Sequence, residues 1–151
     1  MEDSKDFPKV AVDNFKQGYN CAQAVLLTFA DEAGLNQELA LKLASSFGGG
    51  MGRLREVCGA VSAMFMIAGI LKGYTSNTDD FAKSEHYSLI QKLAEEFKQT
   101  HSTIICRELL NLSEKQSSPI PSERNEEYYS VRPCEHYIKT AAELITQHLI
   151  S

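Results

Sequence analysis

Apolar residues recur with the period of an α-helix along most of the chain. In residues 36–47 they form one stripe, made of Leu39, Ala40, Leu43, Ala44 and Phe47. The same period recurs in residues 79–99, at Ala82, Leu89, Ile90, Leu93 and Phe97, and in residues 134–150, at Cys134, Ile138, Ala141, Ala142, Ile145 and Leu149. No stretch alternates with period two over the length of a strand. The pattern predicts an all-α, single-domain helical bundle over residues 1–151.

Residues 57–71 differ from the other helical segments because they carry no charge over 15 positions. A membrane-spanning helix needs about 20 apolar residues, and Arg55, Glu56 and Lys72 bracket this run closely. We therefore expect a central helix buried on all sides within the bundle, and no integral membrane segment.

Local signals divide the chain between these helices. Gly18 and Gly34 are expected to end helices, and Asn20 to cap the next one, with Gln23 in the position of a capping box. Residues 113–133 contain prolines and many Ser and Glu residues. They predict one long irregular loop before the last helix, of a length that is usually functional or mobile in a compact domain.

The overall charge excludes some partners. The chain of 151 residues has a net charge of −5 and no basic cluster, so we expect no nucleic-acid partner. The polar, acidic start lacks the features of a secretory signal, so a cytoplasmic location is expected. An oligomeric assembly stays open.

The candidate chemistry lies in four cysteines, Cys21, Cys58, Cys106 and Cys134. No two of them lie within one helical turn in the sequence, so CxxC and zinc-ribbon spacings are absent. Each follows a signal for the start of a helix and shares the phase of that helix's apolar stripe. Helix N-termini favour negative charge and lower the pKa of a thiol. We therefore expect the four thiols to converge on one cavity as catalytic residues or as ligands of a metal or cluster, although a buried free cysteine is often only a small apolar residue.

A glycine-rich loop precedes the uncharged helix. Residues 48–52 with Arg53 and Arg55 could hold an anion at a helix start, although they match neither common phosphate-binding motif. The alternative is a tight turn that lets Gly59 and its small neighbours pack closely. Arg53, Arg55 and Gly59 are thus candidate cofactor-binding residues, and the two arginines make Cys58 the thiol with the strongest expectation of a lowered pKa. His101 and His136 are weaker candidates, as proton partners of a thiol.

The text around the cysteines resembles the C_GCAxxG_C_C family of redox-active proteins. The matching segments are GYNCAQAVL around Cys21, CGAVSA from Cys58, ICRELL around Cys106 and RPCEHYIKTAAEL around Cys134. Ala63 replaces the last glycine of the family motif. The resemblance implies a small helical redox protein, an oxidoreductase component or electron-transfer protein, with no named substrate or redox partner.

Three uses of convergent thiols remain open at this point. They are an iron–sulfur cluster, one or two reversible disulfides, and a structural zinc site of four cysteines, which the wide spacing makes the least favoured. The CxxCH motif is absent, so covalent haem is not expected. A non-catalytic helical binding module, with its contacts in the loop before the last helix, is the alternative from another class of function.

Overall fold

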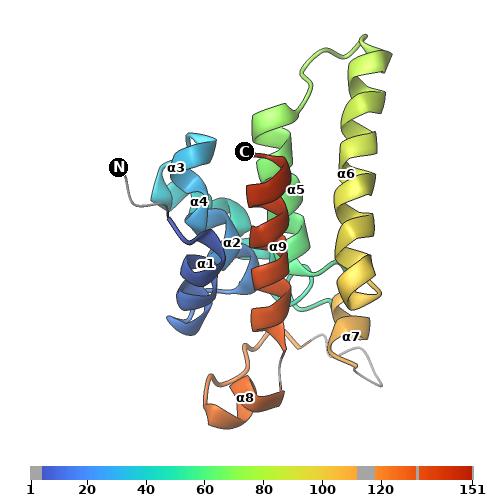
Figure 1. Cartoon of the computed structure of the whole chain (residues 1–151). Coiled ribbons are helices and arrows are strands. Elements are labelled where there is room, and N and C mark those ends of the chain that lie inside the picture. The colour runs from blue at the N-terminus through green and yellow to red at the C-terminus, as the bar shows by residue number, and fades with distance from the viewer. Residues whose placement is uncertain (1–4, 112–117, 132, 151) are drawn as a thin grey trace.

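The computed structural model describes residues 5–111, 118–131 and 133–150, and within these ranges the protein is all-α (Figure 1). The helices are α1 (Phe7–Lys16), α2 (Cys21–Thr28), α3 (Ala30–Ala33), α4 (Gln37–Ala44), the 3-10 turn η1 (Ser45–Phe47), α5 (Gly59–Lys72), α6 (Asp80–His101), α7 (Cys106–Leu109), α8 (Glu126–Val131) and α9 (Cys134–His148). No strand occurs among these residues, which confirms the predicted fold class.

The core forms where α2, α5 and α9 meet. The helix α2 packs against α5, α1 packs against α2 and α9, and the long α6 stands along α5 and α9 (Figure 1). Val25 and Leu26 of α2, Met64 of α5 and Ile138 and Ile145 of α9 are completely buried there. The apolar stripe of α9 is confirmed from Ile138 onward, because every predicted stripe residue beyond Cys134 is buried.

The helix α5 is buried on all sides only in its first turns. Six consecutive residues, 59–64, are buried, but Ile70 near the other end is 43% exposed. In Figure 1 this last turn of α5 rises beyond the end of α9, so that helix does not cover it. The expectation of complete burial is therefore wrong for the C-terminal end. No helix in the described ranges is both long and apolar enough to cross a membrane.

The predicted stripe of α4 is only partly correct. Ala40 and Ala44 are completely buried, whereas Leu39 and Leu43 are 50% and 43% exposed. The short helix packs mainly against α2, and only the narrow face with the alanines points inward. In α6, similarly, Leu93 and Phe97 are buried while the apolar residues nearer its start are less so.

The segment before α9 is not one irregular loop. Residues 126–131 form α8, and Asn125 begins this helix by accepting a hydrogen bond from the backbone N–H of Tyr128 at 2.9 Å. The expectation of an irregular stretch is wrong for this part. Residues 113–117 and 132 of the predicted loop lie outside the described residues.

Candidate functional site

All four cysteines stand at the start of a helix, as the sequence predicts. Cys21, Cys106 and Cys134 are the first residues of α2, α7 and α9, and Cys58 is the N-cap of α5. The start of α2 is fixed by the predicted capping box. The side chain of Asn20 accepts from the N–H of Gln23 at 2.8 Å, and the Gln23 side chain accepts from the N–H of Asn20 at 3.1 Å.

A short backbone pairing joins the starts of α5 and α7. Val57 and Ile105 form an isolated antiparallel bridge. The N–H of Cys58 donates to the carbonyl of Ile104 at 2.8 Å, and the N–H of Cys106 donates to that of Glu56 at 2.6 Å. This pairing brings together two cysteines that are 48 positions apart in the sequence.

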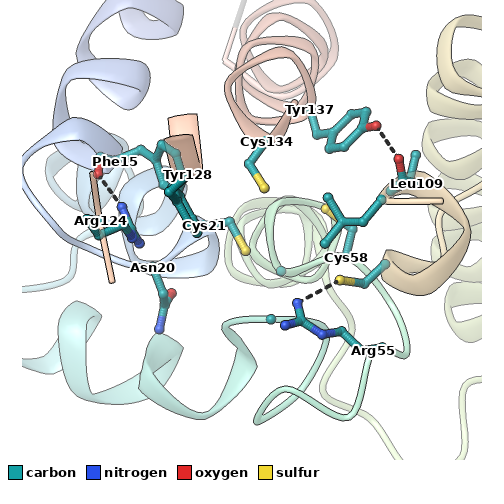
Figure 2. Close-up of a pocket in the computed structure, with 14 residues that line it drawn as sticks. Phe15, Asn20, Cys21, Arg55, Cys58, Leu109, Arg124, Tyr128, Cys134 and Tyr137 are labelled. Atoms are coloured by element: carbon teal, nitrogen blue, oxygen red, sulfur yellow. Dashed lines mark hydrogen bonds between the residues drawn. The ribbon is translucent and has the colours of Figure 1, made fainter. Parts of the chain in front are cut away.

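The four cysteines line one cavity of about 70 Å³. Figure 2 shows the sulfurs of Cys21 and Cys134 pointing into the same space from α2 and α9. Tyr137 and Leu109 lie on one side of this space and Tyr128 lies on the other. The predicted convergence of the four thiols is therefore confirmed.

Two glycines leave room for two of the cysteines. A Cβ atom on Gly59 would lie 2.5 Å from the Sγ atom of Cys21, and a Cβ atom on Gly50 would lie 2.6 Å from the Cβ atom of Cys106. Gly50 also has φ of +72°, which favours glycine. The glycine run thus forms a tight turn that packs directly against the cysteine site.

The thiols of Cys21 and Cys58 interact with each other, and this interaction separates their acidities. The neighbouring Cys58 thiol contributes most to the lowering of the pKa of Cys21, which is about 6 although burial opposes the shift. The backbone N–H groups of Gly49, Gly59 and Ala22 contribute the rest of the lowering. The same interaction raises the pKa of Cys58 well above its usual value, and burial adds to this. The thiolate is therefore favoured on Cys21, while Cys58 keeps its proton.

The expectation that Cys58 has the lowered pKa is therefore wrong, because Cys21 and burial raise it. The two arginines on which the expectation depended contact other groups. Arg55 is only 3% exposed, and its Nη1 donates to the Sγ atom of Cys106 at 3.6 Å. Arg53 does not line the cysteine cavity, and its Nη1 donates to the hydroxyl of Ser122 at 3.3 Å.

Tyr137 is a member of the site that the sequence analysis missed. Burial, with smaller contributions from the neighbouring thiols of Cys134, Cys58 and Cys106, raises the pKa of Tyr137 to about 12. Its hydroxyl donates to the carbonyl of Leu109 at 2.7 Å, which ties α9 to α7. A tyrosine near the start of a helix carries no distinctive local signal, so the sequence alone could not have marked it.

The two candidate histidines do not line the cysteine cavity. The Nε2 atom of His101 lies 2.8 Å from the hydroxyl of Thr140, and its ring meets that of Tyr137 edge-on at 4.8 Å. Burial lowers the pKa of His101, and the charge of His136 lowers it further. His136 is exposed, and both histidines lie along a separate surface hollow. Their proposed role as proton partners of a thiol is not supported.

Arg124 is a second residue of the site that the sequence analysis missed. It holds the segment before α8 over the cavity. Its Nη1 and Nη2 atoms donate to the carbonyls of Phe15 at 2.9 Å and Tyr19 at 3.1 Å. Its guanidinium lies over the rings of Phe15 at 4.3 Å and Tyr128 at 5.0 Å (Figure 2). One arginine thus joins α1, the turn before α2 and α8 at the edge of the cysteine site.

The thiols do not form a metal-binding group in this arrangement. Among the residues that the structure describes, no three or more His, Cys, Asp or Glu side chains lie where they could hold one metal ion. A zinc site of four cysteines requires each sulfur at about 2.3 Å from the metal. The cysteine site as it stands does not fit a resident metal.

Fold and site together define a small all-α protein with four helix-initiating cysteines around one cavity. The sequence profile of the family described as "Putative redox-active protein (C_GCAxxG_C_C)" matches residues 19–148, so the chain belongs to this family, as the segments around the cysteines predict. No curated protein sequence and no solved structure matches the chain significantly.

Proposed function

We propose that the protein is a thiol–disulfide redox protein in which Cys21 and Cys58 form the reacting pair. The observation that carries this proposal is that Cys21 and Cys58 line one cavity, with the Sγ atom of Cys21 packed against Gly59, the residue that follows Cys58. The lowered pKa of the Cys21 thiol supports it. A thiolate is the form that attacks a disulfide, and a neighbouring thiol can resolve the product.

The proposed reaction oxidises the protein and reduces a disulfide substrate. The Cys21 thiolate attacks one sulfur of the substrate, which forms a mixed disulfide and releases the first substrate thiolate. Cys58 then loses its proton to that thiolate and attacks the Sγ atom of Cys21. The second substrate thiolate leaves and takes a proton from water. Two electrons pass from the cysteine pair to the substrate, and two thiols are produced for one disulfide.

Cys106 and Cys134 complete the proposed set of reacting thiols. Their support is their position around the same cavity and, for Cys106, the hydrogen bond from Arg55, which favours a thiolate. In this proposal they re-reduce the Cys21–Cys58 disulfide by exchange and pass the oxidation to a dithiol partner protein. We assign the reaction to the cytoplasm, where thiol reductants maintain such a pair.

The test is to map the disulfide that forms when the reduced protein meets a limiting amount of a small disulfide. Peptide mass mapping should recover Cys21 linked to Cys58 as the first product. Cys58→Ala should instead retain a mixed disulfide on Cys21, and Cys21→Ala should react slowly. Cys134→Ala is the matched control and should still form the Cys21–Cys58 bond.

Two results would contradict the proposal. One is a first disulfide that excludes Cys21. The other is a protein that, after anaerobic purification, carries stoichiometric iron and a visible absorption band that depends on the four cysteines, because the thiols would then serve a cluster.

A further inference from the structure

A larger hollow adjoins the cysteine cavity. It has a volume of about 370 Å³ and is bordered by the glycine loop, the start of α2 and the segment before α8. The two spaces share five lining residues, namely Asn20, Gly49, Arg55, Arg124 and Tyr128. A molecule in the hollow therefore lies next to the cavity that holds Cys21.

The side chains around this hollow are strongly biased in charge. Arg53, Arg55 and Arg124 line it, and the described residues of its wall include no aspartate or glutamate. This contrasts with the chain as a whole, whose net charge is −5. Arginine stays protonated at any physiological pH, so the three side chains give this wall a positive charge that attracts a carboxylate.

The two volumes differ in what they can admit. The cavity of about 70 Å³ is much the smaller of the two, whereas the hollow of about 370 Å³ can take the body of a small molecule. In Figure 2, Arg124 and Tyr128 lie on the side of Cys21 that faces away from Leu109 and Tyr137. A substrate that enters past Arg124 thus brings its disulfide to Cys21.

We propose, on the basis of the proposed function, that this hollow binds the carboxylate end of a low-molecular-weight anionic disulfide. The positive charge of the arginines attracts the carboxylate into the hollow, and the disulfide sulfur reaches the Cys21 thiolate in the cavity. The attack forms a Cys21 mixed disulfide and releases one carboxylate-bearing thiol. Cys58 then displaces the second such thiol, so that one substrate disulfide becomes two thiols while the cysteine pair is oxidised.

The experiment compares three disulfides that differ mainly in charge. They are 3,3′-dithiodipropionate, which is an anion, bis(2-hydroxyethyl) disulfide, which is neutral, and cystamine, which is a cation. The rate constant for oxidation of the reduced full-length protein by each probe is divided by that for the same probe with 2-mercaptoethanol, which removes intrinsic reactivity. We expect the normalised rate constant of the anion to exceed that of the cation by about tenfold or more at low salt, and the ratio to fall at high salt.

Arg53→Gln tests the wall directly, because Arg53 lines the hollow but not the cysteine cavity. This variant should lower the ratio of the anionic to the neutral probe by about threefold, the effect of one charge at several ångströms in water. Lys98→Gln removes a charge from an exposed position of α6 and is the matched control, with no expected change in the ratio.

The outcomes separate this inference from the proposed function. If all three probes form the Cys21–Cys58 disulfide at equal normalised rates, or the cation is fastest, the inference is overturned and the proposed function stands. If no probe forms that disulfide, both fail. The comparison of the three probes on the unchanged protein decides the matter even if Arg53→Gln does not fold.

Discussion

At the scale of single residues, the acidity of Cys21 comes from uncharged donors. The S–H group of Cys58 and the backbone N–H groups of Gly49, Gly59 and Ala22 surround its sulfur. The sequence pointed to Arg53 and Arg55 as the source of a low pKa, but these side chains act at other places in the site. Backbone donors have no sequence signature of their own, and their effect depends on which loop lies against the helix start.

The first prediction concerns this acidity. The alkylation rate of Cys21 by iodoacetamide, followed on the Cys21 peptide by mass spectrometry, should rise with pH about a midpoint near 6. Cys58→Ala removes the largest lowering contribution and should move the midpoint upward, whereas Cys58→Ser keeps an O–H donor and should move it less. A midpoint at or above about 8.5, the usual value of a free cysteine, would contradict the assignment of Cys21 as the thiolate.

The second prediction concerns the space that Gly59 leaves for Cys21. Gly59→Ala places a Cβ atom 2.5 Å from the Sγ atom of Cys21 and 2.7 Å from the carbonyl oxygen of Phe47. Forcing these atoms apart should cost about 1–3 kcal/mol of unfolding free energy and slow the alkylation of Cys21 at neutral pH.

Gly69→Ala, in the same helix, is the control for this prediction. A Cβ atom at Gly69 meets no atom within 4 Å. Because alanine is the better helix former, this variant should stabilise the protein by about 0.5–1 kcal/mol and leave Cys21 unchanged. Equal urea midpoints for the two variants would show that Gly59 has no special role.

At the scale of helices, the sequence predicts those features that depend on interactions between residues a few positions apart. The capping box of Asn20 and the left-handed end at Gly34 are as expected, since each depends on residues a few positions apart. Leu39 and Leu43 are exposed although they share a stripe with buried alanines. Which part of a stripe faces the core depends on the neighbouring helices, and periodicity does not contain that information.

The same distinction holds for the candidate site. The four cysteines could be named because each follows a local helix-start signal and all lie in the family's motif segments. Arg124 and Tyr137 could not, because their contacts are with residues far away in the sequence, Phe15 and Leu109. Their own surroundings in the sequence resemble those of ordinary loop and helix residues.

The third prediction belongs to the segment that contains α8. Arg124→Gln removes two hydrogen bonds from a charged donor to the carbonyls of Phe15 and Tyr19. Such bonds contribute about 1.5–3 kcal/mol each, so the open state of this segment should become at least about tenfold more populated. Amide hydrogen exchange in residues 118–131 and alkylation of Cys21 should both accelerate.

Lys98→Gln is again the matched loss of charge, and it should change neither rate. If Arg124→Gln accelerates exchange in the α8 segment but leaves the alkylation of Cys21 unchanged, the segment does not control access to the cavity.

At the scale of the whole molecule, the cysteine pair links folding to pH. The pKa of Cys21 is about 6 in the folded protein, against about 8.5 for a free cysteine. Between these values the unfolded chain binds more protons at Cys21 than the folded protein does, so unfolding free energy rises with pH. Above pH 9 the opposite shift of Cys58 takes over, because the raised pKa keeps this thiol protonated longer in the folded state.

The last prediction follows from this linkage. The contribution of Cys21 should be fully present above its usual pKa and should disappear as the pH falls through about 6. Each pKa unit corresponds to about 1.4 kcal/mol. The unfolding free energy of the reduced protein, measured by urea denaturation under a thiol reductant, should therefore increase from about pH 6 to about pH 8 more steeply than that of Cys21→Ser. Histidines titrate in the same range but are present in both proteins, so the difference between the two curves isolates the thiol. Parallel curves would mean that Cys21 has the same pKa in both states, and the thiolate on which the proposed chemistry depends would then not exist at neutral pH.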